Sequence, residues 1–148
     1  MPCESVRRNI MNRRQAREQA FLLIYEMDFH TEADYLEIYA NARSTRELED
    51  NDFVRNTFAG VYENREAIDA IISACAVGWK VDRVSSVALA IMRLCVYEMV
   101  FSDDVPVNVA LNEAIELAKK YDEDNAPAFI NGVLNKVAKE HARKTGNE

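Results

Sequence analysis

Three arginines near the start of the chain have the side chains best suited to bind a charged ligand. Arg13, Arg14 and Arg17 come just before an apolar pattern with helical spacing. At about 100° per residue, Arg13, Arg17 and Phe21 fall within about 80° of one another, and Arg14 lies at the edge of that sector. The flat guanidinium group suits phosphates and stacking better than an ammonium group does. The spacing therefore indicates a basic strip beside the buried face, suited to RNA or another phosphate.

The distribution of charge along the chain bears on this interpretation. A run of arginines is usually a solvated helix face, and that simpler alternative stays open on the pattern alone. The net charge of the chain is −7, yet residues 1–20 carry five Arg against Glu4 and Glu18. Residues 21–70 carry twelve acidic residues against four Arg. A basic end on an acidic body indicates one basic contact surface and a separate acidic one.

No motif in the sequence indicates catalysis. The chain contains no GxSxG, GxGxxG, GxxxxGK[ST] or HExxH pattern. His30 and His141 lie in polar segments, and no cysteine has a recognisable base beside it in sequence. Cys75 and Cys95 fall on apolar stripes, which favours buried, inert thiols. We therefore expect no enzyme activity.

Sequence spacing also predicts no metal site and no cofactor. The acidic segment from Asp122 could suggest calcium. An EF-hand loop starting there would need Gly at its sixth position and Glu at its twelfth, where Pro127 and Val133 stand. His30 has no second ligand nearby in the sequence, which favours a surface or capping role.

Composition favours one helix-rich domain in the cytoplasm. A chain of 148 residues with 49% hydrophobic residues, four Gly and three Pro can form a core without disulfides. Three scattered cysteines, including Cys3, fit reduced thiols. The chain has no apolar run long enough to span a membrane and no cleavable signal segment.

Apolar residues recur with a helical period along most of the chain, which predicts an all-α fold of about seven helices and no strand. The expected helices cover residues 12–28, 32–43, 53–75, 81–101, 107–121 and 125–138. The expected inward residues of the first two are Ala16, Ala20, Leu23 and Met27, then Tyr35, Leu36 and Tyr39. We expect Gly60 to allow a close helix contact and Arg93 to face outward or lie at an edge.

The last two expected helices form a pair joined by a short acidic connector. Asn108 and Asn125 are the expected N-caps. The first stripe is Val107, Leu111, Ala114, Ile115 and Ala118, and the second is Ile130, Val133, Leu134, Val137 and Ala138. Gly132 interrupts the second helix at a cost of roughly 1 kcal/mol, so we expect another group to approach its backbone. Phe129 can join the core or offer a stacking face, and residue type alone favours the core.

Several segments resemble the NusB family of bacterial antitermination factors. LNEAIELAKKY followed by FINGVLNKVA is similar to the C-terminal helix pair of that family. IMRLCVYEM with SDDVPVN, and the N-terminal RRQAREQAFLLIYEM, resemble it in the same order. The resemblance covers roughly residues 12 to 140. It implies two small packed helical bundles in one domain, 12–141, with subdomains about 12–77 and 79–141, an N-terminal tail, 1–11, and a C-terminal tail, 142–148.

The resemblance also implies a function. Proteins like NusB bind the boxA element of RNA with NusE, a small-subunit ribosomal protein. They join the RNA polymerase elongation complex with other Nus factors and suppress termination in ribosomal RNA operons, and some form homodimers. The implied RNA-binding residues are Arg13, Arg14, Arg17, Asn125 and Phe129. The implied NusE-binding residues are Tyr25, Arg93, Glu113 and Glu116.

Three residues depart from the family's pattern: Gln15 interrupts the arginine cluster, Ala128 stands where a basic or polar residue is expected, and Ala88 stands where relatives tend to carry charge. Two other functional classes compete with RNA binding. A helical protein–protein adaptor would use the acidic surface and leave the arginines solvated. A helix-turn-helix DNA-binding protein would need a basic recognition helix preceded by a short turn and a partner helix, and the only basic helix here is the first.

Overall fold

The computed structural model describes residues 11–30, 33–46, 48–76 and 84–142. These residues form seven α-helices and one short π-helical segment, and they contain no strand. The elements are α2 (Arg13–Met27), α3 (Tyr35–Arg46), α4 (Asp52–Glu63), α5 (Arg65–Cys75), α6 (Ser86–Val96), η2 (Tyr97–Phe101), α7 (Val107–Tyr121) and α8 (Ala126–His141). The all-α prediction is confirmed for the described residues.

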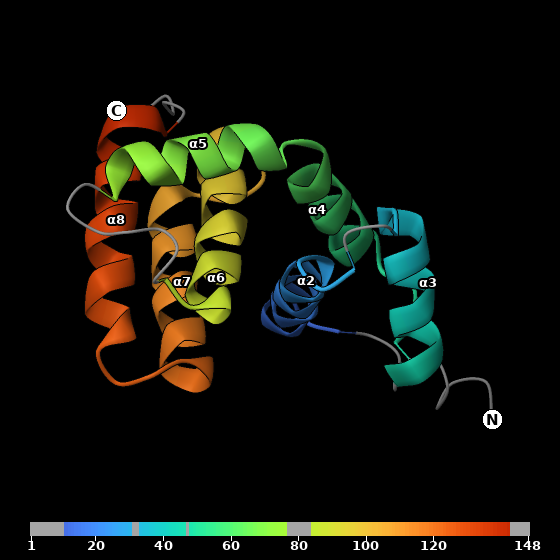
Figure 1. Ribbon diagram of the computed structural model, residues 1–148. Helices are drawn as coiled ribbons and strands as arrows, with labels where there is room; N and C mark the ends of the chain where they lie inside the picture. Colours follow the sequence, from blue (N-terminus) through green and yellow to red (C-terminus); the bar gives the residue numbers. More distant parts are fainter. Residues whose placement is uncertain (1–10, 31–32, 47, 77–83, 143–148) are drawn as a thin grey trace.

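Helix α2 lies between the two groups of helices that make up the molecule (Figure 1). Helix α4 packs on one side of it and α6 on the other. The four residues of its predicted inward stripe are all buried, as are Phe21 and Ile24. This wide apolar surface lets α2 contact both groups of helices. Each end of α2 therefore lies close to other helices.

The long helix expected over residues 53–75 is wrong, because Asn64 divides it into α4 and α5. The Asn64 side-chain amide donates a hydrogen bond to the carbonyl of Gly60 at 2.8 Å and so competes with the helical pattern. Asn64 is both the C-cap of α4 and the N-cap of α5. The break turns α5 across α6 and α8 (Figure 1). The predicted subdomain boundary near Gly78 lies outside the described residues.

Gly60 allows a close helix contact, as expected. A Cβ atom there would lie 2.4 Å from the ring of Tyr97, the first residue of η2. The expectation for Gly132 is wrong, because a Cβ atom there would meet nothing within 4 Å. The two glycines look alike in sequence, but only Gly60 lies between packed helices.

The second predicted helix is confirmed with a shifted boundary and a different inward face. Helix α3 ends at Arg46 instead of Arg43, and Ile38, Tyr39 and Ala42 are buried. Leu36 is 58% exposed, so its predicted inward position is wrong. The Tyr39 hydroxyl donates a 2.6 Å hydrogen bond to Asp50, which anchors the segment between α3 and α4.

The helix expected over residues 81–101 begins, among the described residues, at Ser86. The Ser85 hydroxyl caps it by accepting a 3.0 Å hydrogen bond from the backbone of Ala88. Ala88 is buried, so its lack of charge suits its position. The last turn widens into the π-helical η2, which carries Glu98 and Met99 into the interior.

Helices α7 and α8 form the predicted pair, and they run antiparallel (Figure 1). Helix α7 begins after Pro106 without a side-chain cap, so the expected cap at Asn108 is wrong. Asn125 stands at the N-cap of α8 but makes no side-chain capping hydrogen bond. The buried residues of α7 are Ala110, Glu113, Ala114, Leu117 and Ala118. Those of α8 are Ile130, Val133, Leu134 and Val137, four of the five predicted.

The inward face of α7 is turned by one position relative to the prediction, because Glu113 is drawn in by the arginines of α2. None of the helices in the described ranges is long and apolar enough to cross a membrane.

Candidate nucleic-acid interface

A capping box fixes the first turn of α2 and the arginines on it. The Asn12 side chain accepts a 2.8 Å hydrogen bond from the backbone of Gln15, and the Asn12 backbone donates a 3.0 Å bond to the Gln15 side chain. These bonds satisfy N–H groups that have no partner within the helix. Gln15, which interrupts the arginine cluster in sequence, therefore has a structural role that holds Arg13 and Arg14 in place.

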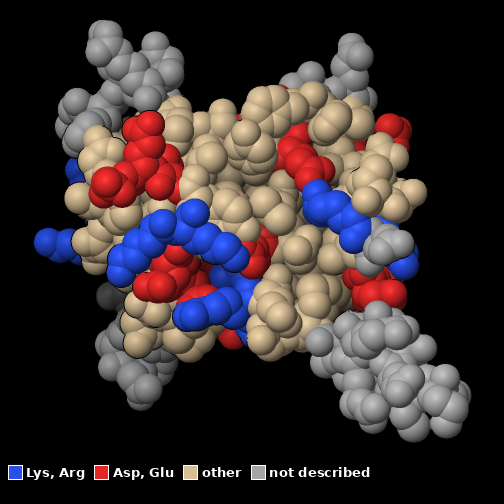
Figure 2. Space-filling model, turned by 90° about the horizontal axis from the view of Figure 1, so that it is seen from below, with Lys and Arg blue, Asp and Glu red and all other residues tan. Residues whose placement is uncertain are grey.

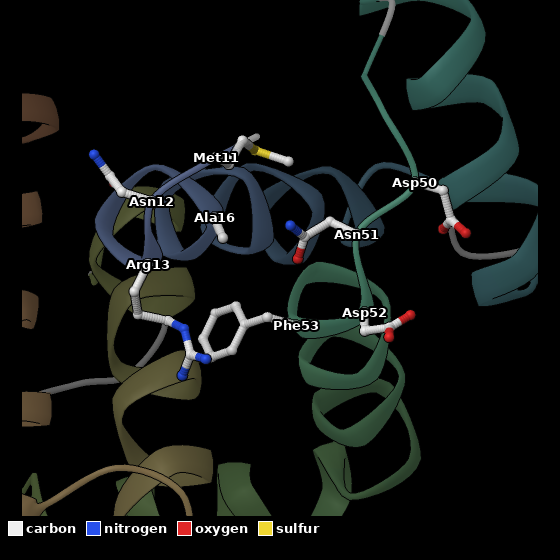
Figure 3. A pocket seen from close by; sticks show the side chains of 8 residues that line it. All are labelled: Met11, Asn12, Arg13, Ala16, Asp50, Asn51, Asp52 and Phe53. Carbon is white, nitrogen blue, oxygen red and sulfur yellow. The ribbon is translucent and has the colours of Figure 1, made fainter. Parts of the chain in front are cut away.

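Arg13 is exposed and stacks on an aromatic ring. Its guanidinium carbon lies 4.2 Å from the centroid of the Phe53 ring, which projects from the first turn of α4. Figure 3 shows Arg13 reaching toward Phe53 at the edge of a hollow between α2 and the start of α4. Stacking occupies the flat face of a guanidinium group and leaves its N–H edges pointing sideways. An anion at the surface can approach those edges.

The hollow beside Arg13 has mixed chemistry. It has a volume of about 540 Å³ and is lined by Met11, Asn12, Arg13, Ala16, Asp50, Asn51, Asp52 and Phe53. Asp50 and Asp52 both accept hydrogen bonds from Arg55, at 2.7 and 2.6 Å. The hollow therefore offers one cation and one aromatic edge, with carboxylates on the side away from Arg13 (Figure 3).

Arg14 forms a two-pronged ion pair with Glu113 of α7. Its Nε donates to one carboxylate oxygen at 3.1 Å and its Nη2 to the other at 2.6 Å. The hydrogen bond from Arg14 is the main cause of a lowered pKa of the Glu113 carboxyl. The Arg14 side chain is still 66% exposed, so part of it faces solvent.

Arg17 is buried, which differs from the basic strip expected on the surface. It is 4% exposed, and its Nε lies 3.1 Å from both carboxylate oxygens of Glu98. Its Nη1 lies 3.5 Å from Glu113. Glu98 is itself 2% exposed, and burial raises the pKa of its carboxyl. The exposed part of the strip is therefore Arg13 and Arg14, and Arg17 joins α2 to η2 and α7.

Phe129 and Asn125 lie at the start of α8. Phe129 is partly buried and packs against the core, so its ring is only in part a surface group. Asn125 is exposed. The preceding end of α7 is tied to α2 by a 2.5 Å contact between Lys120 and Glu18, and by a hydrogen bond from the Tyr121 hydroxyl to Glu18. The start of α8 thus follows a segment anchored one turn beyond Arg14.

The residues expected to bind a protein partner lie at both ends of α2. Tyr25 packs on Phe29 with ring centroids 5.0 Å apart, and Phe29 is 59% exposed. Glu113 contacts the arginines at the other end. Glu116 is exposed and lies 3.5 Å from Lys119.

Arg93 is buried, so its expected outward position is wrong. Its guanidinium donates to Asp69 of α5 at 2.8 and 2.9 Å and to Asp28, the C-cap residue of α2, at 2.8 Å. A helical wheel cannot show this, because the carboxylates that satisfy Arg93 come from other helices.

The surface charge is mixed. On the face in Figure 2, described Lys and Arg side chains alternate with Asp and Glu, so no uninterrupted basic patch covers that face. A shallow hollow of about 390 Å³ between α2 and α7 is likewise lined by both positive and negative side chains. It is lined by Arg14, Arg17, Glu18, Glu113, Glu116, Leu117, Lys119 and Lys120.

Related proteins match this chain over most of its length. The model of the NusB family matches residues 14–139. The chain is 43% identical over 131 residues to the transcription antitermination protein NusB of Acetivibrio thermocellus, covering 87% of this chain and 90% of that protein. It is 43% identical over 127 residues to the protein of the same name from Bacillus pumilus, covering 86% and 95%.

Solved structures of NusB proteins match the fold of this chain. NusB of T. maritima matches with a TM-score of 0.80 and 32% identity, over 90% of this chain and 94% of that one. A crystal structure of antitermination factors NusB and NusE in complex with double-stranded RNA matches with a TM-score of 0.77 and 26% identity, over 87% and 97%. Because the family model matches most of the chain and the relatives are this similar in sequence, this chain belongs to the NusB family.

Proposed function

We propose that this protein is a transcription antitermination factor that binds boxA-type RNA of ribosomal RNA operons together with NusE. Its relatives carry the name of transcription antitermination protein, and a protein of the same fold is known in a complex with NusE and RNA. It would work in the cytoplasm, joining the RNA polymerase elongation complex with other Nus factors. This role needs binding surfaces and no catalytic residue.

The observation that carries the RNA-binding part is the fixed and exposed pair Arg13–Arg14 at the start of α2. Both lie on a capped turn, and each is oriented by a contact, Arg13 by Phe53 and Arg14 by Glu113. Their guanidinium groups would contact the RNA backbone. Arg17 would support them from below by holding Glu113 in place.

The start of α8 would add a second contact. Asn125 has a side chain unused as a cap and could hydrogen-bond to a base or phosphate. The exposed edge of Phe129 would stack on an unpaired base, a contact worth about 1–3 kcal/mol in single-strand binding proteins.

Charge arithmetic explains why a partner would be needed. If only Arg13 and Arg14 neutralise phosphates, the slope of log K against log salt for a single strand is about −1.4. That is weak anchoring for a chain of net charge −7. A basic ribosomal protein docked on the acidic body would add positive charge beside the RNA, so the two proteins should bind RNA cooperatively.

The candidates for the NusE surface that solvent can reach are the partly buried Tyr25 and the exposed Glu116. Tyr25 with Phe29 offers an aromatic surface at the end of α2, and Glu116 offers a carboxylate on α7. Arg93 and Glu113 would act indirectly by fixing the helices that carry these groups. A homodimer using the same surfaces would compete with NusE and RNA.

Fluorescence anisotropy of a labelled single-stranded boxA-type RNA, with and without NusE and over a salt series, tests the proposal. The Arg13→Gln/Arg14→Gln variant should bind at least about tenfold more weakly and reduce the salt slope by about 1.4, because two phosphate contacts are lost. Both residues are exposed, so the variant should fold. Reversing the charge of Arg17 would instead disrupt the interior.

Arg65→Gln is the matched control. Arg65 is exposed and stacks on Tyr62 at 4.3 Å, much as Arg13 stacks on Phe53 at 4.2 Å, but it starts α5. Its loss should leave RNA affinity unchanged. Equal losses in the two variants would mean non-specific charge attraction. NusE binding without any RNA binding would favour the adaptor function, and a preference for duplex DNA would favour a DNA-binding regulator.

A further inference from the structure

Three side chains that are not part of the proposed RNA surface gather where α5 ends beside α8. Cys75 is the last residue of α5, and Glu140 and His141 are the last two of α8. Figure 1 shows α5 crossing over to end beside α8. The Cys75 sulfur, a Glu140 carboxylate oxygen and a His141 ring nitrogen all lie within 4.8 Å of one another. We propose that Cys75, Glu140 and His141 form a zinc-binding site that clamps the end of α5 to the end of α8.

The ligand set favours zinc over the other common divalent ions. A thiolate, an imidazole and a carboxylate are the three side-chain ligand types of zinc sites. Magnesium and calcium prefer oxygen ligands alone. Three protein ligands leave a fourth tetrahedral position for water, as in open zinc sites.

The geometry needs only a small adjustment. Zinc bonds of about 2.0–2.3 Å place tetrahedral ligand atoms about 3.5 Å apart. The present separations of up to 4.8 Å must shorten by about 1 Å. Glu140 and His141 are exposed and can change rotamer toward the ion, whereas Cys75 is fixed in the packed interface. The ion would enter from solvent between the two exposed side chains.

The local charge also favours a cation. The C-terminal ends of α5 and α8 both lie here, and each carries the negative end of a helix dipole. A bound cation would be stabilised by these two helix ends and by the carboxylate of Glu140. Lys136, one turn before Glu140 on α8, carries a positive charge that opposes cation binding.

Cobalt titration of the reduced, metal-free full chain tests the site directly. One equivalent of Co²⁺ should give the absorption bands of a tetrahedral cobalt ion with a sulfur-to-cobalt charge-transfer band, and Zn²⁺ should abolish both. Glu140→Gln and His141→Asn should each weaken binding at least about tenfold, because even an outer-shell partner of a metal ligand typically contributes 10- to 100-fold. Cys75→Ser should remove the charge-transfer band. Lys136→Gln should tighten binding.

The chain offers matched controls. His30→Asn removes the other histidine, and Cys3→Ser removes a thiol that is not one of the three proposed ligands. Neither should alter cobalt binding. Zinc at 100 times its dissociation constant should raise the ratio of folded to unfolded protein about 100-fold in the wild type, and magnesium should not.

Three results would overturn the site: no saturable binding of one equivalent, unchanged affinity in both Glu140→Gln and His141→Asn, or loss of the charge-transfer band in Cys3→Ser. Because the exposed ligand variants should fold like the wild type, these results concern metal binding and not folding.

Discussion

Two buried arginines hold the two ends of α2, and their surroundings differ. At the start of the helix, Arg17 pairs with Glu98 and Glu113, whose side chains are 2% and 11% exposed. Beyond its end, Arg93 pairs with Asp28 and Asp69, whose side chains are 32% and 41% exposed. The first cluster lies in the interior and the second borders on solvent. A buried charge that loses its partner costs far more than one that water can reach.

The largest expected effect is that of Arg17→Met. It leaves the Glu98 carboxylate in the interior without its main partner, and we expect a loss of about 3–5 kcal/mol in the free energy of unfolding. Urea denaturation followed by circular dichroism measures it. Arg17→Met/Glu98→Leu should recover most of the loss, because it removes the buried carboxylate as well. A double variant no more stable than the single one would contradict this account.

Arg93→Met should have a smaller effect, about 1–2 kcal/mol by the same measurement. Water can solvate the carboxylates of Asp28 and Asp69 once the guanidinium is gone, so only part of the desolvation penalty remains. A loss as large as that of Arg17→Met would mean that solvent exposure is not what separates the two clusters.

Glu113 predicts a pH dependence specific to the first cluster. The bonds from Arg14 hold the pKa of its carboxyl below the ordinary 4.5. The stabilisation is therefore present above the unfolded pKa and is lost as the pH falls through the folded one. Glu113→Gln should cost about 1 kcal/mol at pH 7, and the difference from wild type should shrink in acid.

The contribution of Glu98 to the pH dependence of stability has the opposite sign. Burial raises the pKa of its carboxyl, so its charge disfavours the folded state above that pKa, and the penalty is relieved as the pH falls through it. Urea titrations from pH 7 to pH 3 of wild type, Glu113→Gln and Arg17→Met/Glu98→Leu separate the two contributions. A Glu113→Gln difference that grows in acid would contradict the assignment.

The smallest expected effect on stability is that of Arg14→Gln, and it distinguishes the exposed Arg14 from the buried Arg17. Arg14 is largely exposed, so Arg14→Gln should change the free energy of unfolding by about 0.5 kcal/mol or less. Its effect on RNA should be clearer, with the salt slope falling by about 0.7 for one phosphate contact. Thermal melts and anisotropy on the same sample measure both. A large loss of stability with unchanged RNA binding would place Arg14 with the structural arginines.

The sequence pattern predicted the helices better than it predicted which side chains contact one another. The inward stripe of α2 follows from local spacing, and the structure has it. The division at Asn64 was missed, because the apolar period runs through it, whereas the backbone of Asn64 leaves the helical conformation and its side-chain amide bonds back to Gly60. The inward face of α7 was displaced, because Glu113 counted as a surface residue.

The sequence by itself determined which segments become helices and where positive charge gathers, since both depend on neighbours along the chain. Only the tertiary structure decided which arginines are buried. Arg17 and Arg93 can be buried only where carboxylates from other helices meet them. The same holds for Cys75 and His141, which meet because α5 turns across α8. Packing sets burial and contacts between distant residues, and no spacing along one helix encodes them.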